Sequence, residues 1–271
     1  MTGATSGIGA VAAETLASRG VRIVFVARDR SRGEASLERL RAIGPTQDHS
    51  VHYADLSRRG DVKLVAEEIA AVAPRIDLLI NNAGLLSNTR RVTEDGLELT
   101  FATNHMAYFA LTGRLRDRLA AGARSINTAS GLHAQGRLDF ADLQMTRGYT
   151  GMQAYSNSKL CNVLFTRELA RRLAGSGITA NCHHPGFVAT RFGSGNQGPA
   201  AWALSAAKYF ALTPRQGAQT MIHLATSPDV AAISGAYFVK SREVEPSRAA
   251  IDAASAQRLW SESVTLCGID Y

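Results

Sequence analysis

The chain has 271 residues, of which 45% are hydrophobic and 20% charged, so it can bury a large core and is neither disordered nor fibrous. No stretch approaches the roughly 18 uncharged apolar residues of a membrane-spanning helix, and no basic and apolar leader follows Met1. The formal charge of +7 comes from arginines spread among Asp and Glu, which predicts solvated helix faces rather than a nucleic-acid module.

Short apolar strands and amphipathic helices alternate along the chain. The predicted strands are residues 22–27, 51–55, 77–81, 125–128, 178–183 and 235–239. Helical spacing of apolar residues appears at Ile8, Val11, Ala12 and Leu16, and again at Val62, Val65, Ile69 and Val72. This alternation predicts an α/β fold with a doubly wound parallel sheet and helices on both faces. Residues 1–271 are expected to form one domain, with a substrate-side lid around residues 191–213.

A glycine-rich turn opens the first predicted helix. Gly3, Gly7 and Gly9 allow tight turning and close approach of a ligand, and the helix start offers free N–H groups to a pyrophosphate. The spacing is G-x-x-x-G-x-G rather than G-x-G-x-x-G, and such a turn can also be only a turn. Because the next strand ends in Ala27 and Arg28, where an acid would contact a ribose hydroxyl, we expect a 2′-phosphate and hence NADP(H).

Tyr155 and Lys159 are spaced to share one face of a helix. An ammonium next to a phenol is expected to lower the phenol pKa from about 10, which would let Tyr155 exchange a proton with an alcohol oxygen. The same spacing also occurs by chance. Ser130 follows a strand, where its hydroxyl would reach the ligand crevice. Asn104 lies in an apolar helix, where a structural role is nearly as plausible as a catalytic one.

These motifs together resemble the short-chain dehydrogenase/reductase family, which has a Rossmann-type fold. The matching features follow the family order over residues 2–190: the glycine turn, residues 81–84, Asn104, Ser130, the Tyr155/Lys159 pair and Pro185-Gly186. Residues 154–173 are most similar to the retinol-dehydrogenase-like branch, as are Ala27-Arg28-Asp29 and His184-Pro185-Gly186. That branch prefers NADP(H) and acts on lipophilic alcohols, aldehydes and ketones.

The resemblance implies a role for each catalytic candidate. Tyr155 would protonate the carbonyl oxygen during reduction, and Lys159 would bind the nicotinamide ribose. Ser130 would hold the carbonyl oxygen, and Asn104 would keep a water that links Lys159 to solvent. The residues implied to bind the cofactor are Gly3, Ser6, Gly7, Ile8, Arg28, Asp55, Leu56, Asn82, Ala83, Gly84, Tyr155, Lys159, Pro185, Gly186, Val188 and Thr190.

One feature of the family is missing. A buried strand should precede the glycine turn, between the strands at residues 22–27 and 77–81, but the chain starts at Met1. A strand of about five residues makes ladder bonds on both sides, so its loss would cost a large part of a domain's stability. We therefore expect the working protein to start upstream of Met1.

Other readings of the same residues stay open. A light-dependent type of carbon–carbon double-bond reductase shares the Tyr–Lys pair, and a non-catalytic NADP(H)-binding sensor or scaffold would keep the glycine turn. Three sparse cysteines without metal spacing predict a reducing, cytoplasmic setting and no bound metal. The expected partner is a small lipophilic carbonyl or alcohol, with a homo-oligomer possible and no nucleic acid.

Overall fold

The structure, a computed structural model, describes residues 1–187 and 212–271. The predicted contacts of Val188 and Thr190, and nearly all of the predicted lid at residues 191–213, lie outside the described residues. No helix within the described ranges is long and apolar enough to cross a membrane.

The strands form a mainly parallel sheet in two parts. One part holds β1 (Val24–Ala27) and β2 (Ser50–Tyr53). The other holds, in spatial order, β3 (Ile76–Asn81), β4 (Leu119–Thr128), β5 (Thr179–His184), β6 (Tyr237–Val239) and β7 (Arg242–Glu243). All paired strands are parallel except β6 and β7, which are antiparallel.

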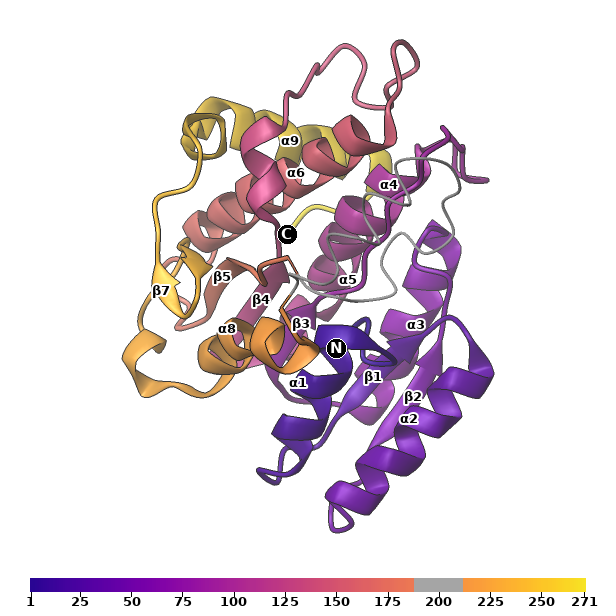
Figure 1. The fold of residues 1–271 in the computed structure, drawn as a ribbon, viewed down its shortest axis with the longest axis vertical. Helices are drawn as coiled ribbons and strands as arrows, with labels where there is room; N and C mark the ends of the chain where they lie inside the picture. The colour runs from indigo at the N-terminus through magenta and orange to yellow at the C-terminus, as the bar shows by residue number, and fades with distance from the viewer. Residues whose placement is uncertain (188–211) are drawn as a thin grey trace.

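The first two residues lie between the two parts of the sheet (Figure 1). Thr2 forms a parallel bridge with Val26, and the Thr2 N–H donates to the Ile80 carbonyl over 2.9 Å. Met1 and Thr2 thus occupy the position between β1 and β3 in which the family resemblance implies a strand. The glycine turn that follows them is therefore set at the carboxyl edge of the sheet.

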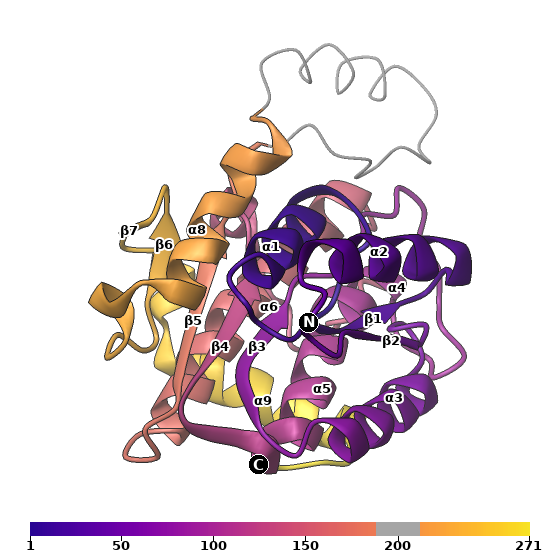
Figure 2. The same cartoon turned by 90° about the horizontal axis from the view of Figure 1, so that it is seen from below.

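Helices cover both faces of the sheet (Figure 2). One face carries α1 (Gly7–Ala17), α2 (Arg30–Ile43) and α8 (Pro214–Thr226). The other carries α3 (Arg59–Val72), α5 (Ala107–Leu115) and α6 (Gly151–Arg172), with α9 (Ala253–Cys267) packed on the outside of α6. The short α4 (Leu99–Phe101) leads through a π-helical turn into α5. This arrangement confirms the predicted doubly wound α/β fold.

Most residues of the predicted apolar stripes lie on the buried faces of their helices, but Val72 at the end of α3 is exposed. In α1, Ala12 and Leu16 are buried, and in α3 so are Val62, Val65 and Ile69.

The strand β4 begins at residue 119, whereas the sequence predicted it only from residue 125. Residues 119–124 escaped prediction because they contain alanine and glycine rather than β-branched side chains. Within this stretch Leu119 and Arg124 pair with β3 across a register shift, and Arg124 also pairs with β5, contacts that a local pattern does not reveal.

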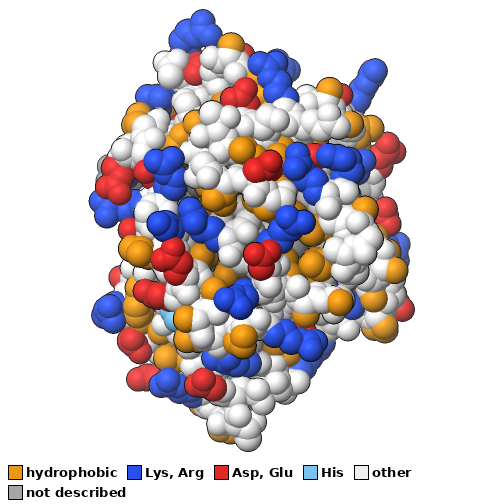
Figure 3. All heavy atoms as spheres, turned by 180° about the vertical axis from the view of Figure 1, so that it is seen from behind, with side chains coloured by type: hydrophobic (Ala, Val, Ile, Leu, Met, Phe, Trp, Pro, Cys, Tyr) orange, Lys and Arg blue, Asp and Glu red, His pale blue; other side chains and the backbone are white. Residues whose placement is uncertain are grey.

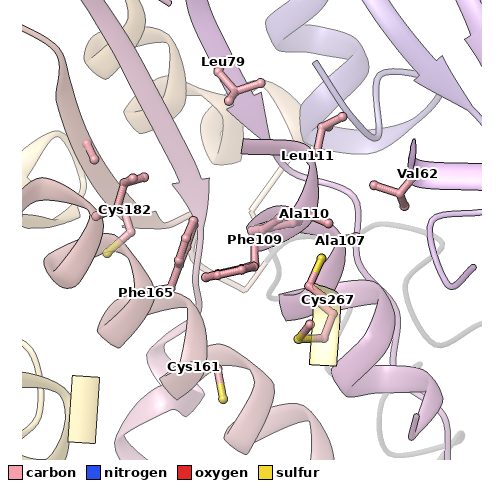
Figure 4. Close-up of a cluster of buried hydrophobic side chains, with 14 of the residues drawn as sticks. Val62, Leu79, Ala107, Phe109, Ala110, Leu111, Cys161, Phe165, Cys182 and Cys267 are labelled. Carbon is pink, nitrogen blue, oxygen red and sulfur yellow. The ribbon is translucent and has the colours of Figure 1, made fainter. Parts of the chain in front are cut away.

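The three cysteines are free and buried in the core (Figure 4). Cys161 lies on α6, Cys182 on β5 and Cys267 at the end of α9. The same core brings the rings of Phe109 and Phe165 to a centroid distance of 5.9 Å. The absence of disulfides among the described residues agrees with the cysteine pattern in the sequence.

Charged side chains of both signs are mixed on the surface (Figure 3). Arg58 pairs with Glu94 at 2.7 Å and Arg75 with Asp77 at 2.8 Å, and all four side chains are at least half exposed. Exposed pairs of this kind contribute little to stability. They agree with the prediction that many arginines belong to solvated faces.

Candidate active site

The glycine turn and the start of α1 form an open anion-binding geometry. Gly3 and Gly7 have φ values of +71° and +58°, a backbone conformation that favours glycine. Ser6 is the exposed N-cap residue of α1, and its side chain makes no capping hydrogen bond. The first N–H groups of α1, including those of Gly7 and Ile8, therefore keep their donor capacity for a ligand, which fits a pyrophosphate.

Gly9 packs directly on the turn, so we expect Gly9→Ala to destabilise the protein. A Cβ atom at this position would lie 2.1 Å from the Gly3 carbonyl oxygen, and the backbone would have to move. We expect a loss of about 1–3 kcal/mol in the free energy of unfolding, measured by urea titration, together with weaker NADPH binding.

Gly60→Ala in α3 is the matched control for Gly9→Ala. A Cβ at Gly60 would meet nothing within 4 Å. This variant should be neutral or gain about 0.4–1 kcal/mol, since alanine lowers the entropy of the unfolded chain. Equal stability of the two variants would contradict the tight packing of α1 on the turn.

Asn82 clamps the glycine turn to the ends of β3 and β4. Its side-chain N–H groups donate to the carbonyls of Thr2 and Gly3, both over 3.3 Å, and its side-chain oxygen accepts from the Thr128 hydroxyl over 3.2 Å. The Thr2 hydroxyl in turn accepts from the backbone N–H groups of Asn82 and Ala83. The side chain of Asn82 thus uses its hydrogen bonds to stabilise the turn. Its contact with a ribose stays a prediction.

Arg28 follows the buried Ala27 at the end of β1 and is exposed. Its side chain makes no hydrogen bond or ion pair with residues 1–187 or 212–271. The neighbouring Asp29 carboxylate accepts from the Arg32 N–H over 2.8 Å and caps α2, and the Arg30 guanidinium lies 4.3 Å from the ring centre of Tyr53. Among the described residues, the side chains of Arg28 and Arg32 both lack a hydrogen-bond or ion-pair partner, and Arg28 lies nearer to the end of β1.

Asp55 and Leu56 follow β2 at the same edge of the sheet. The Asp55 carboxylate accepts from both the N–H and the hydroxyl of Ser57, over 2.9 and 2.7 Å. Leu56 is half-buried against the core. Both residues therefore shape the loop after β2, in the place where the resemblance implies an adenine.

Tyr155 and Lys159 lie side by side on α6, as predicted. The Lys159 ammonium nitrogen is 5.6 Å from the ring centre of Tyr155 and donates to the Thr128 carbonyl over 2.9 Å. Lys159 is only 2% exposed, and its burial lowers its pKa to about 7. Ser130, two residues beyond the end of β4, forms a hydrogen bond with Tyr155. The structure thus brings together three of the four predicted catalytic residues.

The expected shift of the Tyr155 pKa differs from the one in the structure. Burial raises this pKa to about 12, and the hydrogen bond with Ser130 is a smaller effect that lowers it. Burial disfavours the charged phenolate more than its neighbours stabilise it, so the expected lowering of the Tyr155 pKa by Lys159 does not appear. At neutral pH Tyr155 is a protonated phenol.

Asn104 lies in the π-helical turn Ala102–Met106 and anchors the loop after β3. Its side-chain oxygen accepts from the Leu85 N–H over 2.8 Å, and its N–H groups donate to the Leu85 carbonyl and the Ser158 hydroxyl, both over 2.9 Å. A Cβ at Gly84 would lie 3.2 Å from that oxygen and 3.6 Å from the Lys159 nitrogen. Asn104 is thus near Lys159, and its role with a water stays a prediction.

Pro185 and Gly186 follow β5 at the same edge as Ser130. Gly186 has a φ of +85°, and a Cβ there would lie 2.5 Å from the Leu212 side chain. The Leu212 N–H donates to the Phe187 carbonyl over 2.7 Å. These two residues therefore join the end of β5 to the segment that leads into α8.

Histidines near the site are held as neutral side chains. Burial lowers the pKa of His183 to about 3, and its Nε2 lies 3.2 Å from the Thr128 hydroxyl. His133 contacts the Ser130 carbonyl through Nδ1 and the Ser247 N–H through Nε2, and burial lowers its pKa. Both rings are structural neighbours of the site.

A cavity of about 550 Å³ lies on a different side of α6. Ala154, Asn157 and Cys161 line it, and they are turned away from Tyr155 and Lys159 by the helical repeat of about 100° per residue. The chemistry of the Tyr–Lys pair therefore belongs to the carboxyl edge of the sheet and not to this cavity.

Thr128 is the contact that reasoning from the sequence missed. Its carbonyl accepts from both Lys159 and Asn162. A backbone carbonyl leaves no signal in the identity of the side chain, so the sequence could not have pointed to it.

The glycine turn and the Tyr155–Lys159 pair lie at the carboxyl edge of a parallel sheet, where α/β proteins of this fold class bind their ligands. Comparison with known proteins agrees. The family described as short chain dehydrogenase matches residues 1–198. The chain is 39% identical to human retinol dehydrogenase 13, covering 100% of this chain and 84% of that protein, and 38% identical to mouse retinol dehydrogenase 12, covering 100% and 86%.

Solved structures show the same fold. A protein from Mycobacterium Paratuberculosis superimposes with a TM-score of 0.81 at 32% identity, covering 100% of this chain and 92% of that one. A short chain dehydrogenase from Burkholderia cenocepacia J2315 in complex with NADP gives 0.71 at 25% identity, covering 88% and 93%. The chain belongs to the short-chain dehydrogenase/reductase family and is an oxidoreductase of its retinol-dehydrogenase-like branch.

Proposed function

We propose that this enzyme transfers hydride between NADP(H) and the carbonyl or alcohol group of a lipophilic compound. The observation that carries the proposal is the buried Lys159 ammonium beside the Tyr155 phenol, with Ser130 bonded to that phenol. The retinol dehydrogenases among its relatives support a lipophilic substrate, and the relatives in complex with NADP or NADPH support the cofactor.

When bound, the nicotinamide supplies or accepts the hydride. Tyr155 gives its phenolic proton to the carbonyl oxygen during reduction and takes it back during oxidation. The Ser130 hydroxyl donates to the same oxygen and orients it. Lys159 holds its positive charge beside the phenol, which stabilises the phenolate that forms as the proton leaves. Asn104 keeps the loop after β3 in place next to Lys159.

The residues at the glycine turn would hold the cofactor phosphates. Gly3, Ser6, Gly7 and Ile8 would contact the pyrophosphate through the start of α1, and Arg28 would pair with the 2′-phosphate. The neutral phenol of Tyr155 suits the reducing direction at pH 7, because the proton donor is already in place.

Arg28→Ala should remove the preference of the enzyme for NADPH over NADH. Loss of a charge-assisted contact of about 1.5–3 kcal/mol should raise the KM for NADPH about 10–100-fold. The KM for NADH should stay within about 3-fold, since NADH has no 2′-phosphate. Steady-state kinetics with both cofactors measures this.

Arg75→Ala is the control for Arg28→Ala, because Arg75 is another exposed arginine and lies just before β3, at the opposite edge of the sheet. It should change neither KM. A KM for NADPH that is unchanged in Arg28→Ala would remove Arg28 from the phosphate site.

A panel of lipophilic aldehydes, ketones and alcohols, retinol among them, tests the function. Turnover is followed as the change in NADPH absorbance, and NADPH binding is measured separately. We expect turnover in the dark with at least one lipophilic aldehyde. Turnover only in the light would favour a double-bond reductase, and tight NADPH binding without any turnover would favour a non-catalytic sensor.

The cytoplasm is the compartment we propose. The three cysteines are buried and free, which suits a reducing environment. Fractionation of cells that express the protein from its natural gene tests this.

A further inference from the structure

A line of wholly buried polar side chains joins α6 to β3, β4 and α5. We call it the polar seam, and its members are Asn81, Thr112, Asn127, Asn162 and Thr166. Each of them is 0% exposed, and none has a role in the proposed chemistry. Since buried amides and hydroxyls are costly unless they are bonded, the contacts of the seam need an explanation.

The seam attaches α6 to two consecutive residues of β4. The Asn127 side chain donates to the Thr166 hydroxyl over 3.1 Å, and that hydroxyl donates to the Asn162 carbonyl over 2.7 Å. The Asn162 side chain donates to the Thr128 carbonyl over 3.2 Å. These bonds fix the position of α6 along its own axis and its rotation about that axis relative to β4.

The seam continues across β3 to α5, which covers the same face of the sheet as α6. The Asn81 side chain on β3 donates to the Asn127 side-chain oxygen over 2.9 Å and to the Thr112 hydroxyl over 3.0 Å. Two helices and two strands are therefore held in one register. The position of α6 is tied to the strands that carry the carboxyl edge of the site.

Stability alone does not account for the seam. The side-chain oxygens of Asn81 and Asn162 are buried and have no hydrogen-bond partner among residues 1–187 and 212–271. A partly satisfied polar network is less stable than an apolar core of the same volume. Its benefit must therefore lie in what it positions.

The seam shares a helix stripe with the catalytic pair. Tyr155, Lys159, Asn162 and Thr166 follow at i, i+4, i+7 and i+11 on one face of α6. Lys159 and Asn162 donate to the same Thr128 carbonyl, and Ser130 is only two residues further along that strand. Any slide or rotation of α6 on β4 would thus change the position of Tyr155 relative to Ser130.

We propose that the polar seam is a positioning device, in which Asn162 and Thr166 hold Tyr155 and Lys159 in register with Ser130. This inference rests on the proposed function, because it deepens the account of the same site. A displacement of about 1 Å can cost roughly 10²-fold in rate, so small changes in the register of α6 matter.

Asn162→Leu and Thr166→Val test the proposal, with Thr166→Ser as the variant that keeps the hydroxyl. We expect kcat to fall about 10–100-fold in the first two, and the KM for NADPH to stay within about 3-fold. Thr166→Ser should retain kcat within about 3-fold of the unaltered enzyme, since it can still bond Asn127.

Leu164→Ala is the control on the same helix. Leu164 is 0% exposed but lies off the stripe of Tyr155 and Lys159. This variant should lower Tm, because it leaves a cavity, while its kcat stays within about 3-fold of the unaltered enzyme. The comparison separates loss of stability from loss of register.

A second readout needs no substrate. The ultraviolet absorbance of phenolate is titrated with pH, and the contribution of Tyr155 is isolated by subtracting the same titration of Tyr155→Phe. In Asn162→Leu and Thr166→Val the Tyr155 pKa should move from about 12 towards its ordinary value, because water reaches a loosened phenol. Among residues 1–187 and 212–271, the other titratable groups that face the pair are Tyr108 on α5 and His183 on β5, which are unchanged in these variants.

The experiments distinguish failure of the proposed function from failure of the positioning role of the polar seam. If the unaltered enzyme turns over no carbonyl compound, the proposed function falls, and the phenolate titration still decides the role of the seam. If turnover is normal while Asn162→Leu and Thr166→Val keep kcat and the Tyr155 titration at their original values, the seam does not position the pair.

Discussion

Tyr155→Phe should abolish NADPH-dependent carbonyl reduction, with kcat falling by about 10²–10⁴-fold. The variant loses only the phenolic oxygen, which is the proton donor, while the half-buried ring keeps its packing on α6. NADPH binding should stay within about 3-fold, because the glycine turn and Arg28 are expected to supply most of the cofactor contacts and the Tyr155 ring is kept. Single-turnover kinetics and NADPH fluorescence titration measure the two quantities.

Tyr149→Phe is the matched control. The Tyr149 hydroxyl bonds to the Ser87 carbonyl and the Glu98 carboxylate, and burial raises its pKa to about 12 as well. It is a half-buried phenol away from the Tyr–Lys pair, so its loss should leave kcat nearly unchanged. A Tyr155→Phe enzyme that kept a tenth or more of kcat would exclude Tyr155 as the proton donor.

Lys159→Met should make the protein more stable and nearly inactive. Burial lowers the Lys159 pKa from 10.5 to about 7, so at neutral pH the folded protein carries the cost of a desolvated ammonium. Methionine has a similar length and no charge, and the Thr128 carbonyl keeps its bond from Asn162. We expect a gain of about 1–4 kcal/mol in the free energy of unfolding and a loss of about 10²-fold or more in kcat.

The pH dependence of that gain has a definite sign. Between pH 7 and 10.5 the unfolded chain binds the Lys159 proton and the folded protein does not, so the stability of the unaltered protein rises with pH in this window. The variant lacks this rise. Its advantage should be largest below pH 7 and should shrink as the pH increases, as urea unfolding at several pH values would measure. An advantage that grew with pH would contradict the burial of Lys159 as a charged group.

Much of the fold follows from local pattern. The stripe of Ala12 and Leu16, the run of β-branched residues in β1 and the strand β3 were all predictable, because their periodicity reflects which side faces the sheet. The first half of β4 was not predictable, because alanine and glycine have low strand propensity and the pairing there is made at Leu119 and Arg124. The π-helical turn that holds Asn104 likewise depends on its bonds to Leu85.

The properties of the candidate active site likewise fall into those that the sequence predicts and those that depend on tertiary structure. The sequence by itself determined that Tyr155 and Lys159 share a helix face and that the glycine turn opens α1, since the helical repeat and the freedom of glycine are local properties. Only the tertiary structure decided that Lys159 is buried, that the Tyr155 pKa rises instead of falling, and that Asn162 meets Thr128 across 34 positions of the chain. The physical reason is that desolvation and register depend on what other segments bring to a residue.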